Sequence, residues 1–340
     1  MTEWLWSGIG LVSSLLLVWL TLQLVQRAGL IAHPNQRSSH KAPTPTGGGL
    51  GIMVLILSYL GVVVAPEASI GSYWLVAIGG LAVIGLWDDF ADIKARFRLP
   101  VQLGAVGLMI WSLLSLAGGW PDAALMQIWW VLAALGLLWF VNLYNFMDGI
   151  DGIAAMQCFT FCLAVQIISG GVPGWAGALI WLLAGSSLGF LCFNWPPARI
   201  FMGDVGSQGL GLLLGGLVLL LEGMHSVSIP ASVILLSVFW FDASYTLAVR
   251  LFTGQPIAQA HRSHLYQRLA QRYGHLFTTL SFLVFMSVWL LPLAWYASHL
   301  HNAGLFWAPW MLVALAVVPL GVLCQRFAAG RVIEYKQDVS

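Results

Sequence analysis

The sequence predicts an all-α polytopic membrane protein, and three observations lead to this fold class. Hydrophobic residues make up 59% of the 340-residue chain and charged residues only 8%, whereas about a quarter of a typical soluble domain is charged. The apolar residues occur in runs long enough to cross the roughly 30 Å hydrocarbon core of a bilayer. These runs also allow all fourteen Lys and Arg residues to be placed on one side of the membrane.

The apolar runs predict about eleven transmembrane helices, or ten if the fifth and sixth runs form one broken helix. They cover approximately residues 5–25, 47–65, 72–87, 99–118, 126–146, 152–170, 174–193, 207–222, 229–249, 276–297 and 307–325. Cations follow the odd-numbered spans, so the positive-inside rule makes those loops cytoplasmic and the N-terminus external. Arg27 comes after the first run and no basic residue precedes it, which excludes a cleavable signal peptide. No repeat or hydrophilic domain interrupts the pattern, so residues 1–340 are predicted to form one integral membrane domain.

Charge and cysteine content exclude other functional classes. The net charge is +1, and no basic face is available to follow a nucleic acid backbone. The four cysteines lie inside or at the edge of apolar runs with no metal-ligand spacing, so they are predicted to pack as small apolar residues.

Two adjacent acidic residues, Asp88 and Asp89, follow the third apolar run. Neighbouring carboxylates repel each other unless water, a cation or a shared proton separates their charges. At the end of a membrane helix a divalent cation is a natural partner. The alternative is that the pair only stops the span at the membrane interface.

A second polar segment follows the fifth run. Asn142, Asn145 and Asp148 are three residues apart, so on a helix they share one stripe that faces the bundle interior. Asp151 continues this spacing, and two intervening glycines allow backbone amides to approach a ligand. Polar groups at this depth mark function by default. The alternative is hydrogen bonding between helices by the amides, and we favour a binding site.

A third polar segment, residues 203–207 (GDVGS), leads directly into the eighth run. The free N–H groups at such a helix start can bind phosphate oxygens. Asp204 is predicted to be a third carboxylate for a metal ion. Mg²⁺ fits better than Zn²⁺ because the candidate ligands are carboxylates without a Cys/His set, and Mn²⁺ is an alternative. Phe201 either stacks on a base or is an ordinary core aromatic.

Two longer loops carry basic and histidine residues. His261 and His264 share a helical face, and with Arg262 they predict a phosphate site, because a structural zinc would need two further ligands. In the loop over residues 26–46, Lys41 and Thr44 predict either a diphosphate clamp or an ordinary loop.

Asp242 lies within the ninth apolar run. An acid at membrane depth needs a partner, and the sequence does not identify one.

In this order, the polar blocks resemble the polyprenyl-phosphate N-acetylhexosamine-1-phosphate transferase superfamily (glycosyltransferase family 4). The matching pieces are residues 41–49, 88–89, 142–152, 193–207 and 261–264. The resemblance implies transfer of a sugar-1-phosphate from a UDP-amino sugar to undecaprenyl phosphate, which releases UMP and leaves undecaprenyl-diphosphate-sugar. It also implies a multi-pass protein of the bacterial inner membrane, with a periplasmic N-terminus and a cytoplasmic active site.

Within the superfamily, residues 37–49 look closest to the branch that initiates O-antigen or related cell-surface glycans. The branch that makes lipid I, by phospho-MurNAc-pentapeptide transfer, usually has a methionine before its paired glycines and a richer histidine run. This branch is the runner-up. A secondary transporter is the rival from another class, but transporters usually show inverted repeats with polar groups at the midplane. The choice of amino sugar and a homodimer are left open.

The resemblance also suggests roles for the polar residues. Asp88, Asp89 and Asp204 would be catalytic, with Asp204 and Asp89 holding Mg²⁺ on the diphosphate and Asp88 orienting or deprotonating the lipid phosphate. The substrate-binding residues would be Lys41, Thr44, Asn142, Asn145, Asp148, Asp151, Phe201, His261, Arg262 and His264. Among these, Phe201 would stack on uracil.

Overall fold

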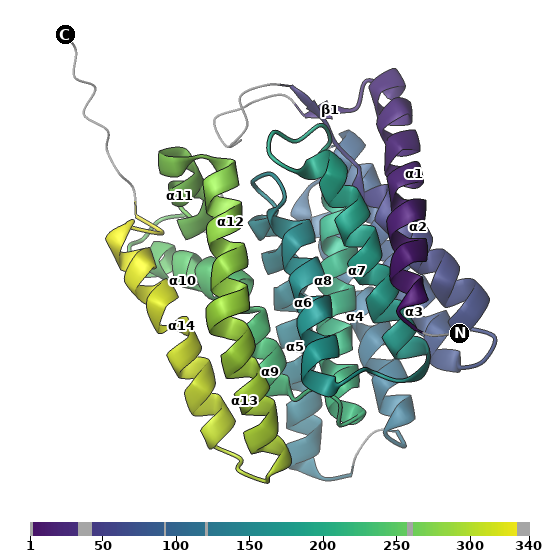
Figure 1. The fold of residues 1–340 in the computed structure, drawn as a ribbon, viewed down its shortest axis with the longest axis vertical. Coiled ribbons are helices and arrows are strands. Elements are labelled where there is room, and N and C mark those ends of the chain that lie inside the picture. The colour runs from purple at the N-terminus through teal and green to yellow at the C-terminus, as the bar shows by residue number, and fades with distance from the viewer. Residues whose placement is uncertain (1–2, 33–42, 92, 120–121, 257–260, 332–340) are drawn as a thin grey trace.

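Helices that run roughly along one axis form the body of the protein (Figure 1). The computed structural model describes residues 3–32, 43–91, 93–119, 122–256 and 261–331. The helices are α1 (Leu5–Ala28), α2 (Gly49–Tyr59), α3 (Ser69–Ala91), α4 (Ala95–Leu116), α5 (Ala124–Met147), α6 (Ile153–Ser169), α7 (Gly174–Asn194), α8 (Asp204–Gly223), α9 (Ile229–Leu235), α10 (Ser237–Phe252), α11 (Leu265–Tyr273), α12 (His275–Phe285), α13 (Leu291–Asn302) and α14 (Ala308–Arg326).

Short irregular elements complete the described chain. Two π-helical turns, η1 (Leu60–Val64) and η2 (Met286–Leu290), continue α2 and join α12 to α13. The strands β1 (Ile31–Ala32) and β2 (Thr44–Pro45) pair antiparallel. They lie at the upper end of the molecule in Figure 1, beside the end of α1, whereas the start of α1 lies in the lower half.

The predicted polytopic class is confirmed. Eight of the helices in the described residues are long and apolar enough to cross a membrane, or nine if the bent pair α9–α10 counts as one span. Two shorter apolar helices, residues 49–64 and α6, fall at the second and sixth predicted runs. Each of the eleven predicted runs is therefore mostly helical, although two of these helices are shorter than the roughly 20 residues that a transmembrane helix usually needs.

The straight helix predicted over residues 229–249 is instead broken. Helices α9 and α10 meet at an angle of 74°, with the backbone of Leu236 outside the helical region. Ser228 caps α9 by accepting a hydrogen bond from the amide of Ala231. The indole of Trp240 donates to the carbonyl of Val233 at 2.8 Å, which provides a donor to a carbonyl near the break.

Asp242, whose partner the sequence did not identify, caps another helix. Its buried carboxylate accepts hydrogen bonds from the backbone N–H groups of Leu265 (2.8 Å) and Tyr266 (2.9 Å), at the start of α11. The bend before α10 brings this acid to the end of the bundle where α11 begins. Asp242 is therefore part of the scaffold that holds α11.

Helix α8 is the central element of the bundle. It is buried along most of its length, whereas α5 exposes most of its surface. Helix α3 packs closely on the start of α8 because Gly85 has no side chain, and a Cβ there would collide with the backbone carbonyl of Asp204. On the other side, the amides of Gly48 and Gly49 donate to the carbonyls of Phe201 and Met202, both at 2.8 Å. The glycine-rich start of α2 thus anchors the segment that leads into α8.

Replacing Asp242 with Leu should lower the apparent melting temperature of the detergent-purified protein. Two backbone N–H groups at the start of α11 would lose their acceptor, which costs about 2–5 kcal/mol. Asp242→Asn keeps one acceptor oxygen and should lie between the variant and the wild type. Thermal unfolding followed by tryptophan fluorescence measures both, and unchanged melting temperatures would refute the capping role.

Candidate active site

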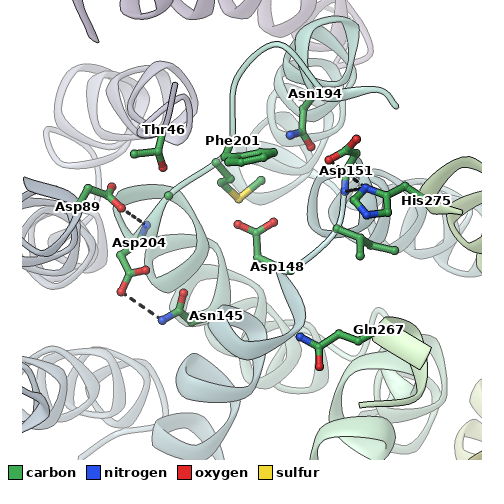
Figure 2. A pocket seen from close by; sticks show the side chains of 14 residues that line it. Thr46, Asp89, Asn145, Asp148, Asp151, Asn194, Phe201, Asp204, Gln267 and His275 are labelled. Atoms are coloured by element: carbon green, nitrogen blue, oxygen red, sulfur yellow. Dashed lines mark hydrogen bonds and ion pairs between the residues drawn. The ribbon is translucent and has the colours of Figure 1, made fainter. Parts of the chain in front are cut away.

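A pocket of about 270 Å³ opens where the polar segments meet at one end of the bundle (Figure 2). Its wall comes from the ends of α3, α5 and α7, the starts of α8 and α12, and the segment before α2. The polar and aromatic residues that line it are Thr46, Asp89, Asn145, Asp148, Asp151, Asn194, Phe201, Asp204, Gln267 and His275. Six residues predicted from sequence are therefore together at this pocket: Asp89, Asn145, Asp148, Asp151, Phe201 and Asp204.

Asp89 caps α8 from a neighbouring helix. One carboxylate oxygen accepts from the amide of Asp204 at 2.8 Å, and the other accepts from the amide of Val205 at 3.2 Å. The first N–H groups of a helix have no partners within it, and a carboxylate there also interacts favourably with the helix dipole. Gly203 makes the turn at φ +74°, and a Cβ at this position would collide with Asp89. Both oxygens of Asp89 thus serve as acceptors for the start of α8, and its metal-binding role stays a prediction.

Arg98 joins the two other predicted catalytic acids. Its guanidinium donates to Asp88 Oδ2 and, at 2.9 Å, to Asp204 Oδ2. The other oxygen of Asp88 accepts from the amide of Ile93 and closes the turn between α3 and α4. Arg98 was not among the site residues predicted from sequence, where this arginine counted only as one of the cations that set the membrane orientation. Its position one turn into the helix after the double acid was the available signal.

Asp204 is held through one oxygen. In addition to Arg98, the side-chain amides of Asn145 (3.2 Å) and Gln208 (2.9 Å) donate to Oδ2. Ser207 orients Asn145 by donating to its Oδ1 at 2.8 Å. Within the described residues none of the hydrogen bonds to this side chain ends on Oδ1, so this oxygen is the one left to bind a ligand.

Asp148 follows α5 and points into the pocket (Figure 2). Loss of surrounding water raises the pKa of this carboxyl well above its ordinary value, and the negative charges of Asp204, Asp89 and Asp151 raise it further. A divalent cation in the pocket would relieve this repulsion. The electrostatics of the pocket therefore favour a bound cation.

Asp151 and Asn194 connect the turn after α5, the segment between α7 and α8, and the start of α12. Asp151 accepts from the amide of Ala198 at 3.1 Å, and its other oxygen lies 3.2 Å from Nδ1 of His275. Asn194 accepts from the amide of Gly152 at 2.9 Å and donates to the carbonyl of Ile200 at 2.8 Å. His275 and Asn194 were not among the site residues predicted from sequence, since their partners lie on distant segments.

The predicted phosphate-binding residues His261, Arg262 and His264 do not line the pocket. His264 is buried, with its Nδ1 3.8 Å from Asp242. Burial, followed by the nearby His264 and Arg250, lowers the pKa of His261 to about 3, so this imidazole is neutral at pH 7. The pocket wall instead receives Gln267 from the following turn.

Three further predicted residues, Asp88, Asn142 and Thr44, are not part of the pocket wall. Asn142 lies one turn deeper and donates to Gln102 and to the carbonyl of Leu138. Thr44 is buried in β2, and Thr46 reaches the pocket in its place. Lys41 lies outside the described residues.

The residues around the pocket fit a Mg²⁺ ion that binds together with a substrate. No group of three His, Cys, Asp or Glu side chains in the described part of the chain forms a ready ligand set. Mg²⁺ does not require one, because it is usually bound through one or two carboxylates with water and substrate phosphates. Asp204, with Oδ1 facing no other donor, and Asp148 supply oxygens of this kind.

Comparison with known proteins identifies the family. The profile of glycosyl transferase family 4 matches residues 72–222, from α3 to the end of α8. A Bacillus subtilis (strain 168) protein described as "Probable undecaprenyl-phosphate N-acetylglucosaminyl 1-phosphate transferase" is 31% identical over 278 residues, which cover 77% of this chain and 76% of that protein. The chain belongs to glycosyl transferase family 4. The superfamily inferred from the polar motifs is thus confirmed.

Two further relatives show the range of names among similar proteins. A "Decaprenyl-phosphate N-acetylglucosaminephosphotransferase" of Mycolicibacterium smegmatis is 35% identical over 218 residues, 56% of this chain and 53% of that protein. A "Phospho-N-acetylmuramoyl-pentapeptide-transferase" of Heliobacterium modesticaldum is 32% identical over 243 residues, 64% of this chain and 74% of that protein. The relatives thus include transferases named for N-acetylglucosamine and one named for phospho-N-acetylmuramoyl-pentapeptide.

Substitutions of Asp89 and Asp148 should have opposite effects on stability. Asp89→Leu removes the acceptor of two N–H groups at the start of α8 and should cost about 2–5 kcal/mol, seen as a lower melting temperature in detergent. Asp148→Asn removes one of several crowded negative charges and should leave the melting temperature unchanged or raised. The reverse order would show that Asp89 is not the cap of α8.

Proposed function

We propose that the protein transfers an N-acetylamino sugar-1-phosphate from a UDP-sugar to undecaprenyl phosphate and releases UMP. An oxygen of the lipid phosphate attacks the β-phosphorus of the donor, and the bond from that phosphorus to the UMP oxygen breaks. The observation that carries this proposal is the meeting of Asp88, Arg98 and Asp204 at the start of α8. They lie beside a pocket lined mostly by residues of the region that matches glycosyl transferase family 4. The relatives named above act on polyprenyl phosphates or on phospho-N-acetylmuramoyl-pentapeptide.

Charge neutralisation and alignment contribute more to phosphoryl transfer than covalent assistance does. Mg²⁺ held by Asp204 would neutralise the donor diphosphate. Arg98, already fixed between two carboxylates, is placed to bind a phosphate oxygen and to keep Asp88 in position. Since the second pKa of a phosphate monoester is about 6, the lipid phosphate is largely ionised at pH 7. Asp88 and Arg98 therefore serve chiefly to orient the attacking phosphate.

The nucleotide is proposed to bind along the wall formed by the segment before α8. Phe201 lies between Asn194 and Asp148 in the pocket (Figure 2) and presents an aromatic ring for stacking on uracil. Its backbone is fixed, because its amide donates to the carbonyl of Pro45 at 2.8 Å. A rigid ring reduces the entropy lost on binding.

An apolar cavity of about 410 Å³ supports binding of the polyprenyl chain. It opens at the break between α9 and α10 and is lined by residues of α5, α8, α9, α10 and α14, among them Leu137, Leu143, Leu219, Val233, Trp240 and Trp310. On α5, Leu143 lines this cavity and Asn145, two residues later, lines the polar pocket. The cavity and the pocket therefore reach a similar level along α5, on different faces of the helix. We propose that a lipid whose tail occupies the cavity places its phosphate in the pocket.

The cations support an orientation and a compartment. Arg27 and Arg326 lie in the last turns of α1 and α14, Arg98 in the first turn of α4, and Arg199 between α7 and α8. These segments are at the end of the bundle where the pocket opens, and the positive-inside rule favours a cytoplasmic position for that end. We therefore propose a bacterial inner-membrane enzyme with a cytoplasmic active site. N-acetylglucosamine is the sugar proposed first, because the name of the Bacillus subtilis relative, which matches over most of both chains, contains this sugar. The product would then initiate O-antigen or a related glycan. Formation of lipid I is the second candidate, supported by the pentapeptide-transferase relatives.

The purified protein with undecaprenyl phosphate, Mg²⁺ and a panel of UDP-N-acetyl sugars should release UMP. Release should require both lipid and metal, and EDTA should abolish it until Mg²⁺ or Mn²⁺ is restored. Asp204→Asn should lower turnover by at least about 10²-fold, because a ligand of the metal is lost, while its melting temperature stays near that of the wild type. Release of UMP by folded Asp204→Asn at the wild-type rate would remove Asp204 from the site. No release by the wild type with any donor, including UDP-MurNAc-pentapeptide, would refute the proposed function.

Filling the apolar cavity should weaken lipid use selectively. Leu219→Trp places a larger side chain in the cavity and should raise the KM for undecaprenyl phosphate several-fold, with the KM for the UDP-sugar unchanged. Leu132→Trp is the matched control, since Leu132 lies on the exposed side of α5 and does not line the cavity. Equal lipid KM values for the two variants would place the polyprenyl chain elsewhere.

A further inference from the structure

Three side-chain amides on three helices form a chain that ends on Asp204. Asn142 of α5 donates to Oε1 of Gln102 on α4 at 3.1 Å, and Gln102 donates to Oε1 of Gln208 on α8 at 3.1 Å. Gln208 then donates to Oδ2 of Asp204 at 2.9 Å. Gln208 and Gln102 do not line the pocket, so they are not in a position to contact a substrate there.

The direction of this amide chain is fixed at its far end. The Nδ2 group of Asn142 also donates to the backbone carbonyl of Leu138 at 2.9 Å. Turning the amide of Asn142 over would place an oxygen against that carbonyl, which is repulsive. With Asn142 set as a donor, Gln102 must present its oxygen to Asn142 and its NH₂ group to Gln208. Gln208 is therefore left with its NH₂ group directed at Asp204.

Because these side-chain amides are buried, each of their donors and acceptors that lacks a partner costs free energy. Gln208 is fully buried and Gln102 is 4% exposed, and both lie in helices that are candidate membrane spans. An unpaired amide in such surroundings costs several kcal/mol. A leucine or methionine at either position would avoid this risk, so the polar residues need a reason beyond filling space.

That reason lies in the geometry of Asp204. Rotation of an aspartate carboxylate about its last side-chain bond meets little resistance, so the direction of its oxygens depends on hydrogen bonds. Asn145 lines the pocket and Arg98 is partly exposed, so a phosphate or water can compete for both of these donors. Gln208 is the buried donor, on the side away from the pocket.

We propose that Gln208 is a positioning residue, which together with Gln102 and Asn142 holds Oδ2 of Asp204 and keeps Oδ1 turned toward the substrate and its cation. This inference rests on the proposed function for the role of Asp204. It also assigns Asn142 a place behind the site, where the sequence had placed it among the substrate-binding residues.

The test compares two buried glutamines. Gln208→Met keeps the size of the side chain and removes the donor to Asp204. Gln157→Met is the matched control, because Gln157 is fully buried in α6 and donates to the carbonyl of Leu235 on another helix at 3.2 Å, away from the pocket. The readouts are the melting temperature, the kcat and KM values of UMP release, and the binding of Mn²⁺ in the presence of UDP, measured from the electron paramagnetic resonance signal of free Mn²⁺.

Gln208→Met should lose more thermal stability than Gln157→Met, because it breaks two hydrogen bonds and the control breaks one. Gln208→Met should also lower kcat by about tenfold, a loss equivalent to roughly 1.4 kcal/mol, and weaken Mn²⁺ binding several-fold, whereas Gln157→Met should do neither. Gln102→Met should give a smaller loss of kcat, since Gln208 would remain but could turn over. The double variant should be no worse than Gln208→Met alone, because both changes act through one chain.

Equal kcat and Mn²⁺ binding for Gln208→Met and Gln157→Met would overturn the inference and leave the amides as interhelical contacts. A kcat loss in the double variant equal to the product of the two single losses would also overturn the inference, because the two glutamines would then act independently. If the wild type releases no UMP from any donor, the proposed function fails separately. The Mn²⁺ measurement then decides alone, with weaker binding in Gln208→Met supporting the positioning role and equal binding refuting it.

Discussion

The structure around the pocket depends on one interaction, the capping of α8 by the carboxylate of Asp89 on α3. The first amides of a helix need acceptors, and at the end of a membrane bundle a neighbouring side chain can supply them. This contact sets α3 against α8, so that Asp88 faces Asp204 across Arg98. The same solution recurs nearby, where Asp242 caps α11 and Asn194 caps the turn into α6.

The fold class and the meeting of the polar segments could be predicted because both depend on patterns along the chain. Hydropathy reveals apolar runs without knowledge of how they pack. Because the cations and the polar segments follow the same spans, the positive-inside rule predicted that the polar segments lie at one membrane face. Asn145, Asp148 and Asp151 all line the pocket. They do not share a helical stripe as the spacing predicted, because α5 ends at Met147 and the two acids follow it in the turn.

The partners of individual side chains could not be predicted in this way, since they depend on which helix ends meet. Asp89 was expected to hold a metal ion, but its oxygens face the amides of a helix that starts over a hundred residues later. Arg98 could not be distinguished from the cations that set orientation, because the sequence does not show that α4 lies beside α8. The break at Leu236 was hidden because an apolar run has the same hydropathy whether or not it bends.

The partners of the acids separate those that support the fold from those available for chemistry. Asp89, Asp151 and Asp242 each accept hydrogen bonds from backbone amides of other segments. Asp204 is held by side chains through one oxygen, and Asp148 has a raised pKa in a pocket shared with other acids. Such a pocket repels an anionic diphosphate, even with Arg98 beside it. A divalent cation that entered together with such a diphosphate would remove this repulsion and relieve the crowding of the carboxylates at the same time, so we expect the two to bind with positive cooperativity.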